Sequence, residues 1–240
     1  MVAQTKGLVI EGRGAQQLTP SRPADRPVVD LPPVTLSLLV ICVTIHLAGA
    51  LAEPQVLRAW QQAFQLSPPG SPYFRFWQPL SYALLHGGWL HLGFNMLGLC
   101  VFGTKLERHF GATWTLEVFG VSVLWAAIAH VLLSPLIGRP TALLGSSGGL
   151  YGLLVAYSVA FPKEKSLLLP GLEVSARTLA AIFAALELYL LFPASLPGAN
   201  WLAQLTGNIS HLAHLGGMAG GLLLSQSVAT SVEDDQNGPS

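Results

Sequence analysis

Charged side chains are scarce in this sequence. Asp, Glu, Lys and Arg make up 10% of the 240 residues, against 51% hydrophobic residues, whereas soluble domains carry about 25% charged residues. This scarcity argues against an ordinary soluble domain and predicts an integral membrane protein. Opposite charges balance to a net charge of zero. Because no basic stripe is present, nothing favours nucleic-acid binding.

Cysteines and several chemical motifs are also scarce or absent. The two cysteines, Cys42 and Cys100, lie in apolar runs and form neither a disulfide framework nor a metal-ligand spacing. No His-Glu-x-x-His string occurs, which excludes the helical zinc-protease motif. No internal repeat of the kind typical of transporters is detectable.

Long uncharged runs predict an all-α membrane protein with six transmembrane helices, because a helix needs roughly 20 apolar residues to cross a bilayer. The fifth helix is the weakest prediction, since Arg177 and Glu187 interrupt it. The predicted spans are residues 34–52, 86–104, 114–134, 145–161, 175–192 and 208–228.

The segments outside the spans differ in character. Residues 1–30 are polar, lack the hydrophobic core of a signal peptide, and are expected to be a disordered cytoplasmic arm before the membrane domain of residues 31–228. Residues 229–240 form a polar, acidic tail. The long first loop, residues 53–85, is rich in aromatic residues. Such residues prefer the headgroup layer, so this loop is expected to lie in the membrane interface.

Lysine and arginine residues predict the orientation. With six spans, nine of them fall on the side of the N-terminus and three on the other. The positive-inside rule then places both termini in the cytoplasm. This orientation makes the second, fourth and sixth helices enter the membrane from outside.

Polar residues gather at the outer ends of those three helices. The second carries His86, His91 and Asn95, the fourth carries Ser147, and the sixth carries His214. Polar groups inside a bilayer are costly and usually functional. The charge count fixed the direction of the helices without using these residues, so their common level indicates a site.

Ser147 and His214 are the predicted catalytic pair. A serine hydroxyl is a weak nucleophile until a base at hydrogen-bond distance takes its proton. The two side chains meet only if their helices approach closely, which glycines permit. The glycines that flank the pair are Gly145, Gly148, Gly217 and Gly221.

Other residues are predicted to support this pair. The backbone N–H of Ser147 and the side chains of His86 and Asn95 are candidate donors to an oxyanion. Tyr151 lies on the same helix face as Ser147 and is expected to pack against the imidazole. No carboxylate is expected near His214, which predicts a Ser-His dyad. His91 is interpreted as structural, and the His211–His214 spacing leaves metal ligation open as an alternative.

These motifs resemble those of the rhomboid family of intramembrane serine proteases. Gly145-Ser146-Ser147-Gly148 is similar to the family's Gly-x-Ser-Gly motif, and His214 with Gly217 and Gly221 is similar to its His-x-x-Gly-x-x-x-Gly helix. The resemblance implies a six-helix bundle, roles for His86 and Asn95 at the oxyanion, and stacking of Tyr151 on the base. It also implies substrate entry between the second and fifth helices.

The expected function is therefore a serine endopeptidase that cleaves single-span membrane proteins near the outer face, within lipid, without metal or organic cofactor. By analogy with the family, the compact six-span form favours a bacterial plasma membrane. The alternative is a non-catalytic membrane binding protein or a transporter with the same fold.

Overall fold

The computed structural model describes most of the predicted membrane domain. For Leu169 and residues 227–236 it describes the backbone alone. The predicted N-terminal arm lies outside the described residues, apart from Asp30. The described ranges are residues 30–138, 141–169, 171–191 and 210–236.

The described chain is mainly helical, in agreement with the predicted class. A short antiparallel hairpin, β1 (Lys165–Leu169) and β2 (Leu172–Ser175), connects α7 to α8. The longer helices are α1 (Pro33–Leu51), α2 (Pro54–Phe64), α4 (Trp89–Gly98), α6 (Ala112–Leu133), α7 (Ser147–Ala160), α8 (Ala176–Leu191) and α10 (His211–Gln236). The shorter ones are α3 (Gln78–Ser81), η1 (Tyr82–Leu84), the π-helix η2 (Leu99–Gly103) and α5 (Thr104–Phe110).

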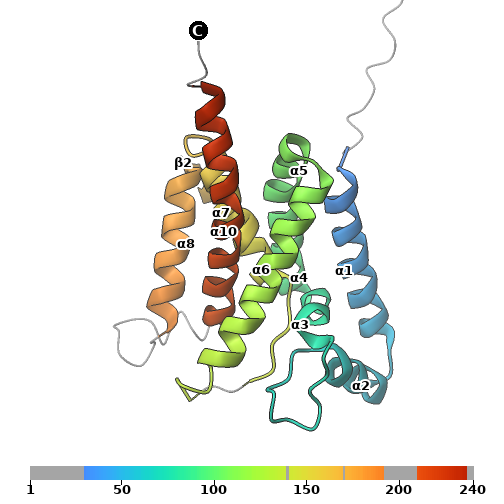
Figure 1. The fold of residues 1–240 in the computed structure, drawn as a ribbon. Coiled ribbons are helices and arrows are strands. Elements are labelled where there is room, and N and C mark those ends of the chain that lie inside the picture. The colour runs from blue at the N-terminus through green and yellow to red at the C-terminus, as the bar shows by residue number, and fades with distance from the viewer. Residues whose placement is uncertain (1–29, 139–140, 170, 192–209, 237–240) are drawn as a thin grey trace, which may run out of the picture. The chain divides into compact units, whose positions relative to one another are not determined.

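Helices α6, α7 and α10 pack most closely together, with α1 and α8 on opposite sides of them (Figure 1). Glycines allow this approach. A Cβ built on Gly217 would lie 3.0 Å from Gly148 Cα, and one on Gly221 would lie 2.6 Å from Gly152 Cα. Any larger residue at these two α10 positions would therefore push the helix away from α7.

Helix α1 is fixed at its first turn by Glu107 of α5. The first amides of a helix have no partner within the helix. Here Val34 N and Thr35 N each donate to the Glu107 carboxylate at 2.7 Å, and Thr35 Oγ1 donates to it at 2.8 Å. The carboxylate thus anchors the N-terminus of α1 to the end of the α4–η2–α5 segment.

The second predicted span begins later than expected. The prediction was residues 86–104, but helix α4 begins at Trp89, so that His86 lies in the connection before it. The segment 89–110 makes an angle of 97° with the helical segment 78–84 that precedes it. Gly87 and Gly88 lie in the corner, where two successive glycines disfavour a continuous helix.

The other predicted spans match the observed helices within a few residues, except that α10 extends to Gln236, beyond the expected end at 228. Among the described residues, α1 and α6 are long and apolar enough to cross a membrane alone, and the bent pair adds a third crossing if counted as one span. Helices of this length and hydropathy are those of an integral membrane protein. The six-span count stays a prediction.

The first loop is ordered by one buried amide side chain. Gln78 accepts from Ser67 N at 3.0 Å and donates to Tyr73 O at 2.9 Å and to Gln62 O at 3.0 Å. Leu66 pairs with Leu143 through two backbone hydrogen bonds of 2.9 Å, which join the loop to the segment before α7. These contacts hold α2 beside the site, while its place in the membrane interface stays a prediction.

Candidate active site

Ser147 is the first residue of α7. The chain turns into the helix at Gly145, whose φ of 121° is favoured only by glycine. The preceding residue, Ser146, makes no side-chain cap on the helix. The N-terminal amides of α7 therefore point into the site without competition from a capping side chain.

His214 lies in the first turns of α10, and this end of the helix is fixed by Ser210. Ser210 Oγ accepts a hydrogen bond from Ala213 N at 3.2 Å, as an N-cap residue does. The same oxygen lies 2.7 Å from His130 Nδ1 of α6. His130 Nε2 donates to Thr141 O at 2.8 Å, so its Nδ1 accepts from the serine. This chain of bonds fixes the helix that carries His214.

Ser147 and His214 meet across the glycine contact of α7 and α10. Ser147 Oγ lies 2.8 Å from His214 Nε2. The imidazole is buried, and the serine is half-buried. A hydroxyl at this distance donates its proton to an unprotonated Nε2, the arrangement that activates a serine nucleophile.

Tyr151 lies one turn after Ser147 and stacks on the imidazole. Its ring is 4.1 Å from the ring of His214, at an interplanar angle of 11°. Phe183 of α8 packs edge-on against Tyr151, with ring centres 5.8 Å apart. Tyr151 therefore holds the plane of the imidazole, and Phe183 in turn holds Tyr151.

A carboxylate does reach His214, so the expectation that none lies near it is wrong. Glu187 of α8 places Oε1 2.9 Å from His214 Nδ1. The ring N–H does not point along this line, so the contact is electrostatic and not a linear hydrogen bond. Glu187 also accepts from the Tyr151 hydroxyl and lies 2.6 Å from His211 Nδ1.

The predicted oxyanion residues His86 and Asn95 have other immediate partners than Ser147. His86 Nε2 is 3.1 Å from the hydroxyl of Ser146. Asn95 Nδ2 donates back to His91 O at 2.8 Å. Two buried atoms, His86 Nδ1 and Asn95 Oδ1, have no hydrogen-bond partner among the described residues. His86 is therefore beside the N-terminus of α7, and Asn95 retains a second N–H for another acceptor.

His91 occupies a packing position. Its ring lies against Gly145, where an added Cβ would be 2.6 Å from His91 Cε1. The ring also meets that of His86 edge-on, at 5.2 Å between centres. Gly145 is thus required both by its positive φ and by this contact.

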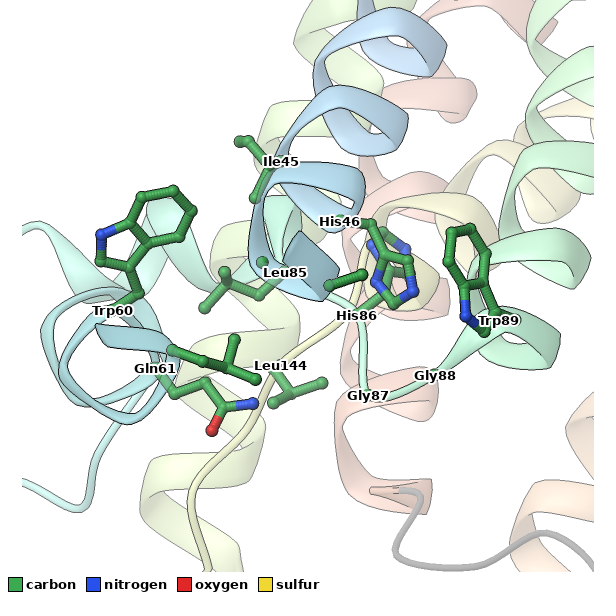
Figure 2. A pocket seen from close by; sticks show the side chains of 13 residues that line it. Ile45, His46, Trp60, Gln61, Leu85, His86, Gly87, Gly88, Trp89 and Leu144 are labelled. Atoms are coloured by element: carbon green, nitrogen blue, oxygen red, sulfur yellow. The ribbon is translucent and has the colours of Figure 1, made fainter. Parts of the chain in front are cut away.

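A cavity of about 240 Å³ lies beside His86. It is enclosed by α1, α2 and the corner before α4, with Trp60 and Gln61 on one side and His46 and Trp89 on the other (Figure 2). Of the predicted site residues, His86 alone lines it, so the cavity reaches His86 and not the serine–histidine pair.

Glu187, His211 and His214 also form a cluster of metal-ligand types, with their nearest ligand atoms within 4.8 Å of one another. Two ligands of one zinc ion, each about 2.0–2.2 Å from the metal in a tetrahedron, lie about 3.3 Å apart. The distances of 2.6 and 2.9 Å from the glutamate to the histidines are shorter. They are typical of direct contacts between a carboxylate and an imidazole nitrogen.

Comparison with known families identifies a match over most of the described fold. The family model for the Rhomboid domain matches residues 73–230. The matched segment begins within the first loop and includes Ser147, Glu187 and His214.

Similar proteins carry the same family name. The chain is 28% identical over 197 residues to the Rhomboid protease GlpG of Serratia proteamaculans, covering 80% of this chain and 62% of that protein. It is 31% identical over 170 residues to Rhomboid protein 1, mitochondrial, of Saccharomyces cerevisiae, covering 63% and 41%. It is 28% identical over 200 residues to the Putative rhomboid protease YdcA of Bacillus subtilis, covering 82% and 89%. The chain thus spans less than two thirds of the first two relatives.

Proposed function

Since this chain belongs to the rhomboid family, we propose that it is an intramembrane serine endopeptidase. Its substrates are single-span membrane proteins, which it cleaves near the outer membrane face. Ser147 is the nucleophile and His214 is the general base. Two of the three relatives above are bacterial, and the proposed location is a bacterial plasma membrane with both termini in the cytoplasm.

The observation that carries this proposal is the contact of 2.8 Å between Ser147 Oγ and His214 Nε2. In the reaction, Oγ attacks the substrate carbonyl carbon while its proton moves to Nε2. The imidazolium then gives this proton to the leaving amine, and an acyl-enzyme remains. Water, deprotonated by the same imidazole, releases the acyl group and restores the serine.

The oxyanion of the tetrahedral intermediate needs hydrogen-bond donors that are already in place. The Ser147 amide at the start of α7 supplies one, and the dipole of the helix adds to its effect. His86 and Asn95 supply side-chain donors from the neighbouring segment. Asn95 Nδ2 retains one N–H beyond its bond to His91 O, and His86 Nδ1 has no partner among the described residues, which supports these roles.

The length of α7 supports cleavage at a level within the membrane. Its 14 residues span about 21 Å at 1.5 Å per residue, against a hydrocarbon core of about 30 Å. Its C-terminal end is followed by the exposed residues Lys163, Glu164 and Lys165, which belong in water. With that end at the cytoplasmic surface, Ser147 lies about 9 Å inside the opposite one.

Reconstitution in liposomes with a single-span substrate tests the proposal. The wild-type protein should cleave the substrate, and Ser147→Ala and His214→Ala should each abolish cleavage without loss of folded protein. Ser158→Ala is the matched serine control, because Ser158 also lies on α7 but donates to Val155 O. His109→Ala, at an exposed position on α5, is the histidine control.

Both controls should cleave at the wild-type rate. Cleavage that survives Ser147→Ala would exclude the serine mechanism. Binding of the membrane substrate without any cleavage by the wild type would favour the non-catalytic alternative.

A further inference from the structure

The geometry points to Glu187 as the positioning residue for His214, which makes the site a Ser-His-Glu arrangement. This inference rests on the proposed function and extends it. Glu187 does not touch the reacting atoms; it acts on them through the imidazole.

Glu187 carries a charge at a position in the membrane domain where charged side chains are rare. From Thr178 to the end of α8, Glu187 is the single charged residue, and its side chain is buried. A carboxylate in a membrane helix is costly unless it is paired and hydrogen-bonded, and such residues are usually functional. Here it faces α7 and α10, which carry Ser147 and His214.

The surroundings of Glu187 consist of donors. Tyr151 O–H donates to Oε1. His211 Nδ1 lies 2.6 Å from Oε2, and His214 Nδ1 lies 2.9 Å from Oε1. An ionised carboxylate accepts from Tyr151 and His211 and attracts the N–H of His214 Nδ1, whereas a protonated carboxyl group would bring a fourth hydrogen into the cluster. The contacts therefore favour the ionised form.

This carboxylate selects the tautomer of His214 that the reaction needs. With Nδ1 protonated and facing Glu187, the lone pair of His214 lies on Nε2, which faces Ser147 Oγ at 2.8 Å. The opposite tautomer would place two acceptors against each other at Nδ1. The N–H is not yet aligned with Oε1, and such catalytic contacts often straighten only when substrate binds.

Proton transfer strengthens the same contact. When the O–H bond of Ser147 breaks and its proton binds Nε2, His214 becomes a cation beside an anion. Their attraction is large where water is excluded. Glu187 keeps its charge throughout and takes no proton. The carboxylate therefore stabilises the imidazolium more than it stabilises the neutral ring.

The test compares Glu187→Gln with a matched control, Glu107→Gln. Glu107 is a second buried glutamate, but its partners are Val34 and Thr35 of α1. In liposomes, Glu187→Gln should lower kcat roughly 100-fold or more with little change in KM. The rate at which a fluorophosphonate labels Ser147, per folded molecule, should fall in parallel. Glu107→Gln should lower the Tm and leave both rates within threefold of the wild type.

A third variant keeps the test decisive if the glutamine variant does not fold. Glu187→Asp retains the negative charge on a side chain that is one methylene shorter, so the carboxylate lies farther from the imidazole. This variant should therefore recover part of the kcat that Glu187→Gln loses. If Glu187→Gln folds poorly, a lower kcat of folded Glu187→Asp at unchanged KM supports the inference, and a wild-type kcat overturns it.

The remaining outcomes separate this inference from the function on which it rests. If the wild-type protein cleaves and folded Glu187→Gln has a kcat within threefold of the wild-type value, the role of Glu187 is overturned. The serine–histidine chemistry then stays in place. A loss of cleavage on chelation that zinc alone restores overturns it in favour of a metal at Glu187, His211 and His214. A wild-type protein whose Ser147 is not labelled overturns both.

Discussion

Two buried glutamates of this protein have the same burial and different surroundings. Glu107 and Glu187 are each 4% exposed. Glu107 binds the first amides of α1 and a threonine hydroxyl. Glu187 faces a tyrosine hydroxyl and two imidazoles. The first set of donors holds its protons throughout, whereas the second includes a ring that gains a proton in the proposed reaction.

This difference separates two uses of a buried charge. The Glu107 carboxylate replaces the partners that the N-terminus of a helix lacks, so it contributes to folding. The Glu187 carboxylate balances a charge that is present only for part of a reaction cycle, so it contributes to the transition state. Burial alone does not distinguish the two; the chemistry of the donors does.

The most specific change to the Glu187 cluster removes a single hydroxyl group. Tyr151→Phe deletes the donor to Oε1 but retains the ring that stacks on His214. One hydrogen bond to a charged group is worth about 1.5 kcal/mol or more, so kcat should fall roughly tenfold. Cleavage kinetics check this, with the Tm as control. An unchanged kcat would mean that Tyr151 acts by stacking alone.

The matching change at Glu107 is Thr35→Val, which deletes the hydroxyl donor at 2.8 Å and keeps the shape of the side chain. The free energy of unfolding should fall by about 1–2 kcal/mol, because a buried hydrogen bond to a charged group is lost. Denaturation in detergent measures the change, and kcat per folded molecule should stay at the wild-type value. A fall in kcat comparable to that of Tyr151→Phe would remove the distinction between the two clusters.

The smallest effect is expected where the charge is exposed. Lys105 and Glu164 form an ion pair of 2.9 Å, with 45% and 41% of their side chains exposed. Lys105→Ala should change the free energy of unfolding by about 0.5 kcal/mol or less, because water and salt screen such pairs. If Lys105→Ala lowers the free energy of unfolding by more than Thr35→Val does, then charge, and not burial, sets how much such a contact contributes to stability.

Local patterns in the sequence predicted much of the fold and part of the site. The predicted spans lie close to observed helices because runs of apolar residues are read directly from the sequence, while the number of membrane crossings stays a prediction. The stacking partner Tyr151 follows from its spacing to Ser147 along one helix. The approach of Gly217 to Gly148 follows from the glycine spacing, since little else permits two helices to come so close.

Contacts between separate helices were not predictable in the same way. Glu187 reaches His214 because α8 packs beside α10 with one particular face turned inward, which no local spacing encodes. The sequence did contain a signal, namely a lone acid in an otherwise apolar segment. The start of α4 at Trp89 depends on the corner at Gly87 and Gly88, so the placement of His86 outside the helix also required the structure.

The proposed chemistry depends on the activation of Ser147 by His214. The most direct measurement is the rate at which a fluorophosphonate labels the protein in liposomes, with the labelled peptide identified by mass spectrometry. The wild type should be labelled at Ser147, and folded His214→Ala should lose this labelling by at least roughly 10³-fold. Labelling at another serine, or labelling of Ser147 at the wild-type rate in His214→Ala, would contradict activation of Ser147 by His214.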